Sequence, residues 1–227
     1  NERHEAWGNL ARKLAHEIKN PLTPIQLTID RLKSKYASQL DENDNENFKE
    51  NLKIINNQIK QIEKLVNEFS DFARMPKPIF QNNDLIVLIN DNIKLLQELD
   101  QTIQIDFIHN NNQIFFNGDK EQLGRVFLNL IKNSIESIQQ KTEKVSNFNK
   151  NITIEVNEFD SHISLTINDN GIGFKNLNNN IKEILNPYFT TKKDGTGLGL
   201  SIVNKIINDH NGSIEFIEKD DGASIKI

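Results

Sequence analysis

The stretch from Leu14 to Tyr36 reads LAHEIKNPLTPIQLTIDRLKSKY, and it decides the architecture of the N-terminal part of the chain. After a first step of four residues, its apolar positions recur at steps of 4, 3, 4, 3 and 4. Alternating steps of four and three place side chains on one stripe of an α-helix, as in the seam of a coiled coil. The stretch is therefore predicted to be a helix with one apolar seam, which consists of Leu14, Ile18, Leu22, Ile25, Ile29, Leu32 and Tyr36.

A second helix of the same kind is predicted after a polar turn at residues 37–46. Two such helices form a hairpin, but a lone hairpin leaves much of each seam in water. We therefore expect residues 1–75 to form a homodimer, in which four helices make a bundle with two-fold symmetry. The alternative is a hairpin that packs on its own chain. The second seam again alternates steps of four and three, through Phe48, Leu52, Ile55, Ile59, Ile62, Val66 and Phe69.

His16 lies on the side of the first helix that faces away from the seam. It is two positions from both Leu14 and Ile18, which corresponds to about 200° around the helix axis. Its imidazole is therefore expected to face solvent. Asn20 shares this face one turn later, and Glu17 is placed to flank the imidazole.

Two prolines follow the histidine within the same helix. Pro21 and Pro24 cannot donate the usual backbone hydrogen bonds and clash with the preceding turn, so we expect a bend just below His16. An exposed histidine, a carboxylate and an amide above such a bend suggest a phosphate-accepting site. An ordinary surface histidine on a kinked helix is the alternative interpretation.

The composition narrows the class of protein. The chain has 227 residues, of which 36% are hydrophobic and 26% charged, and this length is sufficient for two domains. A net charge of −5 gives no electrostatic reason to expect nucleic-acid binding. There is no cysteine, and no apolar run approaches the length that spans a membrane. The chain starts in a predicted helix without an initiator methionine, so we expect it to be a fragment of a longer protein.

The sequence Met75-Pro76-Lys77-Pro78 ends the second helix, because a residue that precedes proline avoids helical geometry. We interpret residues 76–78 as a linker to a second domain at residues 79–227. In that domain Asp84 is predicted to cap one helix. Asp119, with Gln122 three positions later, forms a capping box that opens another.

Alternating apolar and polar residues predict the strands of the second domain. Residues 102–108 and 113–116 flank an asparagine-rich turn, where we expect a β-hairpin. A sheet with helices on one face would result, which makes the fold class α+β. The remaining strands are expected at residues 152–156, 161–168, 213–217 and 223–227.

Asn129 and Asn133 are four residues apart, so their amides share one face of a predicted helix. Amide oxygens are hard ligands suited to Mg²⁺, which also takes phosphate oxygens. In a chain this rich in asparagine, chance placement is the alternative explanation. The pair alone is therefore weak evidence for a metal site.

Asp169 follows a predicted strand and precedes Gly171 and Gly173. A buried carboxylate at a strand end can accept a hydrogen bond from the exocyclic amine of adenine, and glycines allow the backbone to approach the ring. A simple hairpin turn would explain the same residues, because Asp-Asn-Gly is common in turns.

A glycine-rich loop at residues 195–200 opens the last predicted helix. Free N–H groups and the helix dipole make such a position a candidate anion site. The spacing matches neither the Walker pattern nor the Rossmann fingerprint, so the loop alone is weak evidence for nucleotide binding. Thr190, Thr191 and Lys192 precede it and can add hydroxyl and cationic contacts.

Taken together and in this order, the motifs resemble those of the histidine kinases of two-component signalling, and the resemblance covers nearly all of the chain. The stretch EFSDFARMP at residues 68–76 is most similar to the nitrogen-regulation sensor kinases, in particular the membrane-bound NtrY type. The motifs that match the family's boxes are His16-Glu17-x-x-Asn20-Pro21, Asn129-x-x-x-Asn133, Asp169-x-Gly171-x-Gly173, Tyr188-Phe189-Thr190-Thr191-Lys192 and Gly195-x-Gly197-Leu198-Gly199-Leu200.

The resemblance implies different functions for the two domains. Residues 1–75 would be a dimerisation and histidine-phosphotransfer domain, with His16 as phosphoacceptor, Glu17 as the group that accepts its proton, and Asn20 at the family's phosphatase position. Residues 79–227 would be an ATP-binding domain of the α/β-sandwich type shared with chaperone, gyrase and mismatch-repair ATPases. Its nucleotide site would be formed by Asn129 and Asn133 with Mg²⁺, by Asp169, Gly171 and Gly173 at adenine, and by Phe189, Thr190, Thr191, Lys192, Gly195, Gly197, Leu198, Gly199 and Leu200 in and after a mobile lid at residues 174–196.

One position departs from the family pattern. Several members carry a basic residue three positions after the second asparagine, where this chain has Glu136. This departure raises the question of which cation meets the phosphates, and Lys132, Arg125 or Lys192 could take that role.

The resulting hypothesis is an autokinase that transfers the γ-phosphoryl group of Mg-ATP to His16 and then to an aspartate of a response regulator. Its partners would be a second copy of the chain and a receiver domain, with no nucleic acid. Contact with a membrane would come only through segments absent from the fragment, as the cytoplasmic portion of a bacterial inner-membrane protein. One alternative is a mechanical ATPase clamp of the same superfamily. Another is a dimeric scaffold that binds or dephosphorylates a regulator.

Overall fold

The computed structural model describes residues 2–145, 147–174, 181–190, 192 and 195–227. The chain divides into two compact units. The first consists of Asn1–Pro76 together with Thr190–Leu198, and the second of Lys77–Phe189 together with Gly199–Ile227. None of the helices in the described part of the chain has both the length and the hydropathy needed to cross a bilayer.

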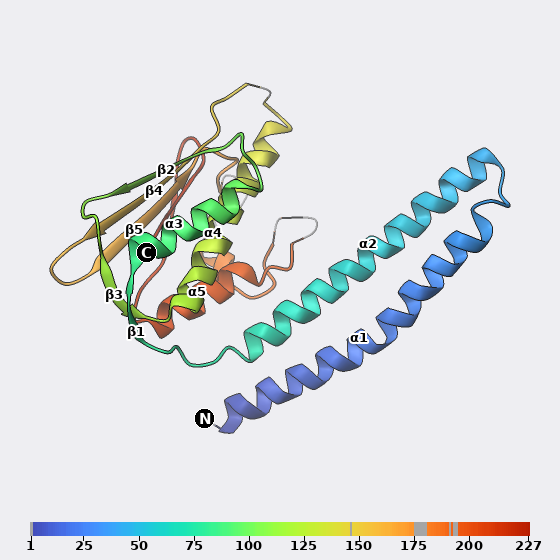
Figure 1. Ribbon diagram of the computed structural model, residues 1–227, viewed down its shortest axis with the longest axis horizontal. Helices are drawn as coiled ribbons and strands as arrows, with labels where there is room; N and C mark the ends of the chain where they lie inside the picture. Colours follow the sequence, from blue (N-terminus) through green and yellow to red (C-terminus); the bar gives the residue numbers. More distant parts are fainter. Residues whose placement is uncertain (1, 146, 175–180, 191, 193–194) are drawn as a thin grey trace. The chain divides into compact units, whose positions relative to one another are not determined.

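Two long helices dominate the first unit, α1 (Glu2–Tyr36) and α2 (Glu42–Ala73), and they lie antiparallel as a hairpin (Figure 1). The turn between them is shorter than the predicted polar segment. It ends at Asp41, whose side chain accepts the Asp44 N–H at 2.9 Å and so caps α2. Helix α1 continues through Pro21 and Pro24, and the predicted bend stays a prediction.

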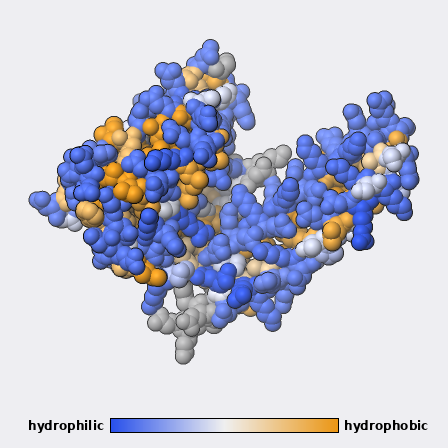
Figure 2. All heavy atoms as spheres, in the orientation of Figure 1, coloured by the Kyte–Doolittle hydropathy of each residue, from blue (hydrophilic) through white to orange (hydrophobic). Residues whose placement is uncertain are grey.

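Each seam divides into two sets of residues. Leu22, Ile29, Leu52 and Ile59 form the buried core between the two helices, with Phe48 packed against it. Val66 is also buried, whereas seven other large residues of the seams are at least about a third exposed on this chain, and Figure 2 shows hydrophobic atoms on the visible surface of the hairpin. The exposed set comprises Leu14, Ile18, Ile25, Leu32, Tyr36, Ile55 and Ile62.

The second unit contains a five-stranded mixed sheet with helices on one face, as predicted (Figure 1). Every second residue of β4 is buried, because Ile152, Ile154 and Val156 share one side of that strand. The strand order is β2-β4-β5-β7-β6, with β2 and β4 parallel and the other neighbours antiparallel. The strands are β2 (Gln104–His109), β4 (Asn151–Glu158), β5 (Ile163–Asp169), β6 (Glu215–Glu218) and β7 (Ala223–Lys226), and the helices are α3 (Leu85–Gln97), α4 (Lys120–Thr142) and α5 (Gly199–Asp209), with a 3-10 turn at Ile181–Leu185.

The predicted β-hairpin over residues 102–116 is wrong. Strand β2 pairs with β4, whereas β3 (Phe115–Gly118) pairs with β1 (Gln81–Asp84) in a separate two-stranded sheet. The asparagines between them bond to the end of β4 instead of closing a tight turn. Asn110 donates to the Glu158 carbonyl at 3.2 Å and accepts the Glu158 N–H at 3.1 Å.

Both predicted helix caps are confirmed, but the capping box at Asp119 is incomplete. Asp84 accepts the Ile86 N–H at 2.9 Å and caps α3 as expected. Asp119 caps α4, but the reciprocal half of the predicted capping box is not formed. The Asp119 N–H donates to Nε2 of His210 at 2.9 Å instead of to the Gln122 side chain. His210 is 91 residues away in the sequence, so no local pattern could indicate this partner.

Candidate functional site

His16 is exposed on α1, and the residues around it form a polar groove. On α1, Arg12 and Lys19 lie one turn before and one turn after His16, on its face of the helix. The groove is also lined by Asn67 and Asp71 of α2 and by Arg74, the residue that caps the end of this helix, and its floor includes Ala15 and Ser70. Three cationic side chains and one carboxylate therefore surround the imidazole.

Small residues bring the two helices close together at this end of the hairpin. Ala11 and Ala15 are buried on α1, and Ser70 and Ala73 on α2. A Cβ at Gly8 would lie 3.2 Å from the Ala73 carbonyl oxygen and 3.2 Å from Cγ of Arg74. This close approach explains why the end of α2 shares a groove with His16.

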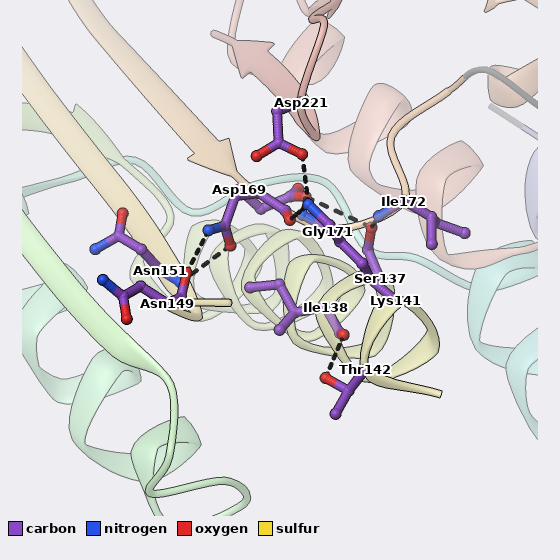
Figure 3. A network of polar contacts seen from close by, with 11 residues as sticks. Ser137, Ile138, Lys141, Thr142, Asn149, Asn151, Asp169, Gly171, Ile172 and Asp221 are labelled. Carbon is purple, nitrogen blue, oxygen red and sulfur yellow. Dashed lines mark hydrogen bonds and ion pairs between the residues drawn. The ribbon is translucent and has the colours of Figure 1, made fainter. Parts of the chain in front are cut away.

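Asp169 ends β5 in the second unit and is only 7% exposed (Figure 3). Burial raises the pKa of its carboxyl above the ordinary value, and the N–H of Gly171, which donates to Oδ1 at 2.9 Å, is the largest influence in the opposite direction. An ionised carboxylate that is shielded from water and has no basic group among its contacts lowers the free energy of unfolding. Ionisable groups with such shifted pKa values are concentrated at functional sites.

Glycines at this loop are required by close contacts. A Cβ at Gly171 would lie 2.2 Å from Oγ of Ser137, and Gly173 has φ +66° with its Cβ position 2.4 Å from the Gly222 carbonyl. Gly222, at φ +86°, in turn packs directly on the Asp169 backbone. Substitution at any of these three positions would displace the loop that carries Asp169.

Two side chains of α4 hold the Asp169 loop in place (Figure 3). Oγ of Ser137 accepts the Ile172 N–H at 3.1 Å and lies 3.5 Å from Oδ1 of Asp169. One turn later, Nζ of Lys141 donates to the Asn170 carbonyl at 2.7 Å and forms an ion pair with Asp221. The loop is therefore fixed to α4 and to the turn between β6 and β7.

Asn129 lies earlier on α4 and is oriented by its amide nitrogen, which donates to the Arg125 carbonyl at 2.9 Å. Its oxygen faces the first turn of α5, since a Cβ at Gly199 would lie 3.2 Å from it. Asn133 is half-buried one turn further along the same face. Oε1 of Glu136 lies 4.0 Å from Nζ of Lys132. Lys132 is one of the three cations that could replace the basic residue that several family members carry at the position of Glu136.

The remaining predicted site residues follow the 3-10 turn. Gly197 has φ +69°, a conformation that favours glycine, and Gly195 leaves room for Oγ1 of Thr190, which accepts the Lys192 N–H at 3.1 Å. The segment Thr190–Leu198 groups with the hairpin unit, whereas Phe189, Gly199 and Leu200 belong to the unit of Asp169. Thr191, and residues 175–180 of the predicted lid, lie outside the described residues.

Sequence reasoning missed several residues around Asp169. Ser137 and Lys141 continue the four-residue spacing of Asn129 and Asn133, so all four lie on one face of α4. That spacing was a usable signal. The role of Asn170, which pairs with Asn151 and Asn149, could not be read from the sequence because its partners come from a different strand and loop.

Two family models match the chain in non-overlapping regions. Residues 6–78 match the His Kinase A (phospho-acceptor) domain, and residues 118–227 match the histidine kinase-, DNA gyrase B- and HSP90-like ATPase. The chain belongs to the histidine kinases. The predicted family, and the fold class of a helical region followed by an α/β ATPase domain, are thereby confirmed.

This histidine kinase is similar to NtrY-type proteins over nearly its whole length. It is 35% identical over 224 residues to a putative NtrY-like sensor histidine kinase of Rickettsia bellii, covering 99% of this chain and 35% of the relative. It is 36% identical over 222 residues to nitrogen regulation protein NtrY of Azorhizobium caulinodans, covering 97% and 28%. The kinase chain thus spans about a third of the length of these relatives.

Among solved structures, histidine kinase ThkA in complex with response regulator protein TrrA matches with a TM-score of 0.64 and 27% identity. The match covers 99% of this histidine kinase and 62% of the ThkA chain. It includes both the helical and the ATPase parts of the present chain.

Proposed function

We propose that this chain is the catalytic core of a sensor kinase, which transfers the γ-phosphoryl group of ATP to His16 and then to an aspartate of a receiver domain. The observation that carries the proposal is the exposed imidazole of His16 in a groove lined by Arg12, Lys19 and Arg74. Three cationic side chains beside an exposed imidazole would attract a phosphate group, with Nη2 of Arg74 also 4.0 Å from Oδ1 of Asp71 in the same groove.

The first step forms a bond between Nε2 of His16 and the γ-phosphorus and breaks the bond from that phosphorus to the oxygen of the leaving ADP. The imidazole must lose its Nδ1 proton, and Glu17, the adjacent exposed carboxylate, is the proposed acceptor. The three cations would offset the charge of the phosphoryl group, as positioning and charge neutralisation carry most phosphoryl-transfer catalysis.

The residues around Asp169 fit an adenine nucleotide. A buried carboxylate can accept the exocyclic amine of the base, and Gly171 and Gly173 leave no side chain between the loop and a planar ring. The Asn129 amide is oriented so that its oxygen, not its nitrogen, faces the N-terminus of α5. We propose Asn133 and Asn129 as the residues that hold Mg²⁺, which would neutralise phosphate charge when bound. The glycines from Gly195 to Gly199 would surround the phosphates.

The exposed set of seam residues supports the proposed homodimer through residues 1–75. A second copy would bury these side chains in a four-helix bundle. A receiver domain would bind beside His16, where Asn20 is exposed one turn away and is the proposed orienting group for water in the phosphatase reaction. Attachment to a bacterial inner membrane through segments outside this chain is proposed from the NtrY-type relatives.

Incubation with γ-³²P-ATP and Mg²⁺ tests the proposal. We expect label that is lost in acid and stable in base, because the product is a phosphoramidate. The His16→Gln variant should lose the label by more than about 100-fold, whereas His162→Gln, an exposed histidine on the second unit, should keep it.

Acid-stable label, or label retained by His16→Gln, would contradict the kinase proposal. ATP hydrolysis at an equal rate in the wild type and in His16→Gln, without any label, would favour the ATPase clamp. Transfer of label from the phosphorylated chain to an added receiver domain tests the second step.

A further inference from the structure

The Ser134 hydroxyl is a buried polar group without a hydrogen-bond partner. Ser134 is 2% exposed on α4, and its oxygen is one of four such buried side-chain atoms in the described part of the chain. The usual alternative for a helical serine, a bond to the carbonyl one turn earlier, is not made, although Thr142 on the same helix makes it to Ile138 at 2.9 Å. An unpaired buried hydroxyl destabilises the folded protein, so its presence calls for an explanation.

Ser134 lies beside the carboxylate of Asp169. Its hydroxyl is near enough to lower the pKa of that carboxyl, but it does not reach the geometry of a hydrogen bond. Ser137, one turn further along α4, differs in this respect. Its oxygen accepts a hydrogen bond from the Ile172 N–H, and its hydroxyl donates to Oδ1 of Asp169. The Ser137 hydroxyl is therefore used as both acceptor and donor within the protein. Of the two serines of α4, Ser134 is the one whose hydroxyl has no hydrogen-bond partner within the described part of the chain.

We propose that Ser134 is a nucleotide-binding residue, whose hydroxyl donates a hydrogen bond to the adenine ring, directly or through one ordered water, beside the amine bound by Asp169. This inference rests on the proposed function, because it assumes that adenine occupies the pocket of Asp169. It assigns Ser137 and Lys141 a different task, which is to position the loop.

The pair of groups matches the edge of adenine. Adenine presents an amine donor next to a ring-nitrogen acceptor, and the pocket offers a carboxylate acceptor next to a hydroxyl donor. Guanine presents a carbonyl and a ring N–H in the reverse order, so it would face the Asp169 carboxylate with an acceptor. A site built from buried hydrogen-bonding groups rejects a ligand that leaves them unpaired. Ser134 therefore contributes to the preference for ATP over GTP.

The proposal predicts that Ser134→Ala raises the stability of the nucleotide-free protein but lowers its affinity for an adenine nucleotide. Nucleotide-free protein should unfold at a temperature about 2 °C higher or more, because the unpaired hydroxyl is gone. Affinity for Mg-ADP, measured by isothermal titration calorimetry, should fall about 5- to 10-fold, the loss expected for one neutral hydrogen bond. Affinity for Mg-GDP should change by less than about twofold.

Ser137→Ala is the matched control, since it makes the same chemical change one turn away and gains the same helix propensity. It should lower the unfolding temperature and weaken both nucleotides, because it releases the Ile172 N–H. Ser134→Cys keeps the size and a weak donor, and should fall between the wild type and Ser134→Ala in ADP affinity.

Two results would overturn the inference while leaving the proposed function intact. One is a Ser134→Ala protein that binds Mg-ADP as tightly as the wild type. The other is a Ser134→Ala protein that unfolds at a lower temperature, which would indicate a purely structural hydroxyl. Failure of the wild type itself to bind Mg-ADP would instead contradict the proposed function.

Discussion

Asp169 is a single residue whose ionised carboxylate lowers the stability of the folded protein. Its carboxylate lies at a strand end with little access to water, and hydrogen bonds from neighbouring groups only partly offset the desolvation. The folded state therefore binds a proton at this position more tightly than the unfolded chain does. Ionisation at neutral pH then works against folding, which is tolerable if the charge is needed for a ligand.

We predict that Asp169→Asn stabilises the nucleotide-free protein at pH 7. Because the pKa of Asp169 is raised on folding, its favourable contribution is complete below the unfolded pKa and is lost as the pH rises through the folded pKa. The advantage of the variant should thus shrink as the pH is lowered from 7 towards 4. Thermal unfolding of both proteins across this range measures the difference. ADP affinity should fall by about tenfold or more.

A variant that is less stable than the wild type at pH 7 would contradict this account of Asp169. Asp106→Asn serves as a control, because Asp106 bonds to Gln104 and Asn151 in a less buried position and its pKa is lowered. Its effect should have the opposite sign at neutral pH.

At the scale of elements, Asp119 joins three segments of the second unit. One oxygen caps α4 through the N–H groups of Glu121 and Gln122, and the other accepts the Ile79 N–H at 2.8 Å. Its own N–H bonds to His210 at the end of α5. The start of α4 is therefore tied both to the residues that follow the predicted linker and to the last helix.

We predict that Asp119→Ala costs about 1–2 kcal/mol or more and destabilises more than Asp84→Ala, which removes a cap of one helix only. Burial raises the pKa of Asp119, but hydrogen bonds from Ile79, Gln122 and Glu121, with His210 nearby, outweigh it and leave the pKa lowered. The stabilisation should therefore be present above pH 4 and be lost as the pH falls through the folded pKa. Urea unfolding at pH 7 and at low pH tests both statements.

Equal costs for Asp119→Ala and Asp84→Ala would show that the bond to Ile79 adds nothing. The loss of stability in Asp119→Asn should lie between those of the wild type and Asp119→Ala. The amide oxygen of asparagine can still cap α4, but its NH2 group cannot accept the Ile79 N–H.

At the scale of the whole molecule, the apolar seams of the hairpin consist of two sets of residues. We call the set that is buried between α1 and α2 the closed half, and the set that is exposed on this chain the open half. The closed half, formed by Leu22, Ile29, Leu52 and Ile59, is satisfied within one chain. The open half leaves residues such as Ile25, at 45% exposed, in water. A two-fold partner would cover it, and this need connects the sequence pattern to the proposed assembly.

We predict that Ile25→Asp weakens self-association by about 100-fold or more, since a dimer would bury two charges without partners. Helix content should persist, because the closed half of the seam is unchanged. Sedimentation equilibrium with circular dichroism measures both. Leu27→Asp is the matched control, because Leu27 is 54% exposed and lies off the seam, so its substitution should leave the dimer intact. Equal dissociation by both variants, or by neither, would contradict the proposed interface.

Local chemistry explains what the sequence alone determined. The step of three and four residues defined both long helices, and the oxygens of Asp84 and Asp119 mark helix starts because a cap acts over only two or three residues. The exposure of His16 also followed from helix periodicity, whereas the burial of Asp169 was established only by the fold. The order of five short motifs was enough to indicate the family.

Tertiary structure decided everything that depends on a partner distant in the chain. Strand β2 pairs with β4 and not with its neighbour β3, and Asn110 between them bonds to the backbone of Glu158 at the end of β4. His210 replaces the expected capping partner of Asp119 from 91 residues away. Ser134 lies on a helix like many serines, and it is the fold that buries its hydroxyl beside Asp169 and leaves it unpaired among the described residues. A sequence records which groups can bond, whereas three-dimensional packing determines which of them are close enough to do so.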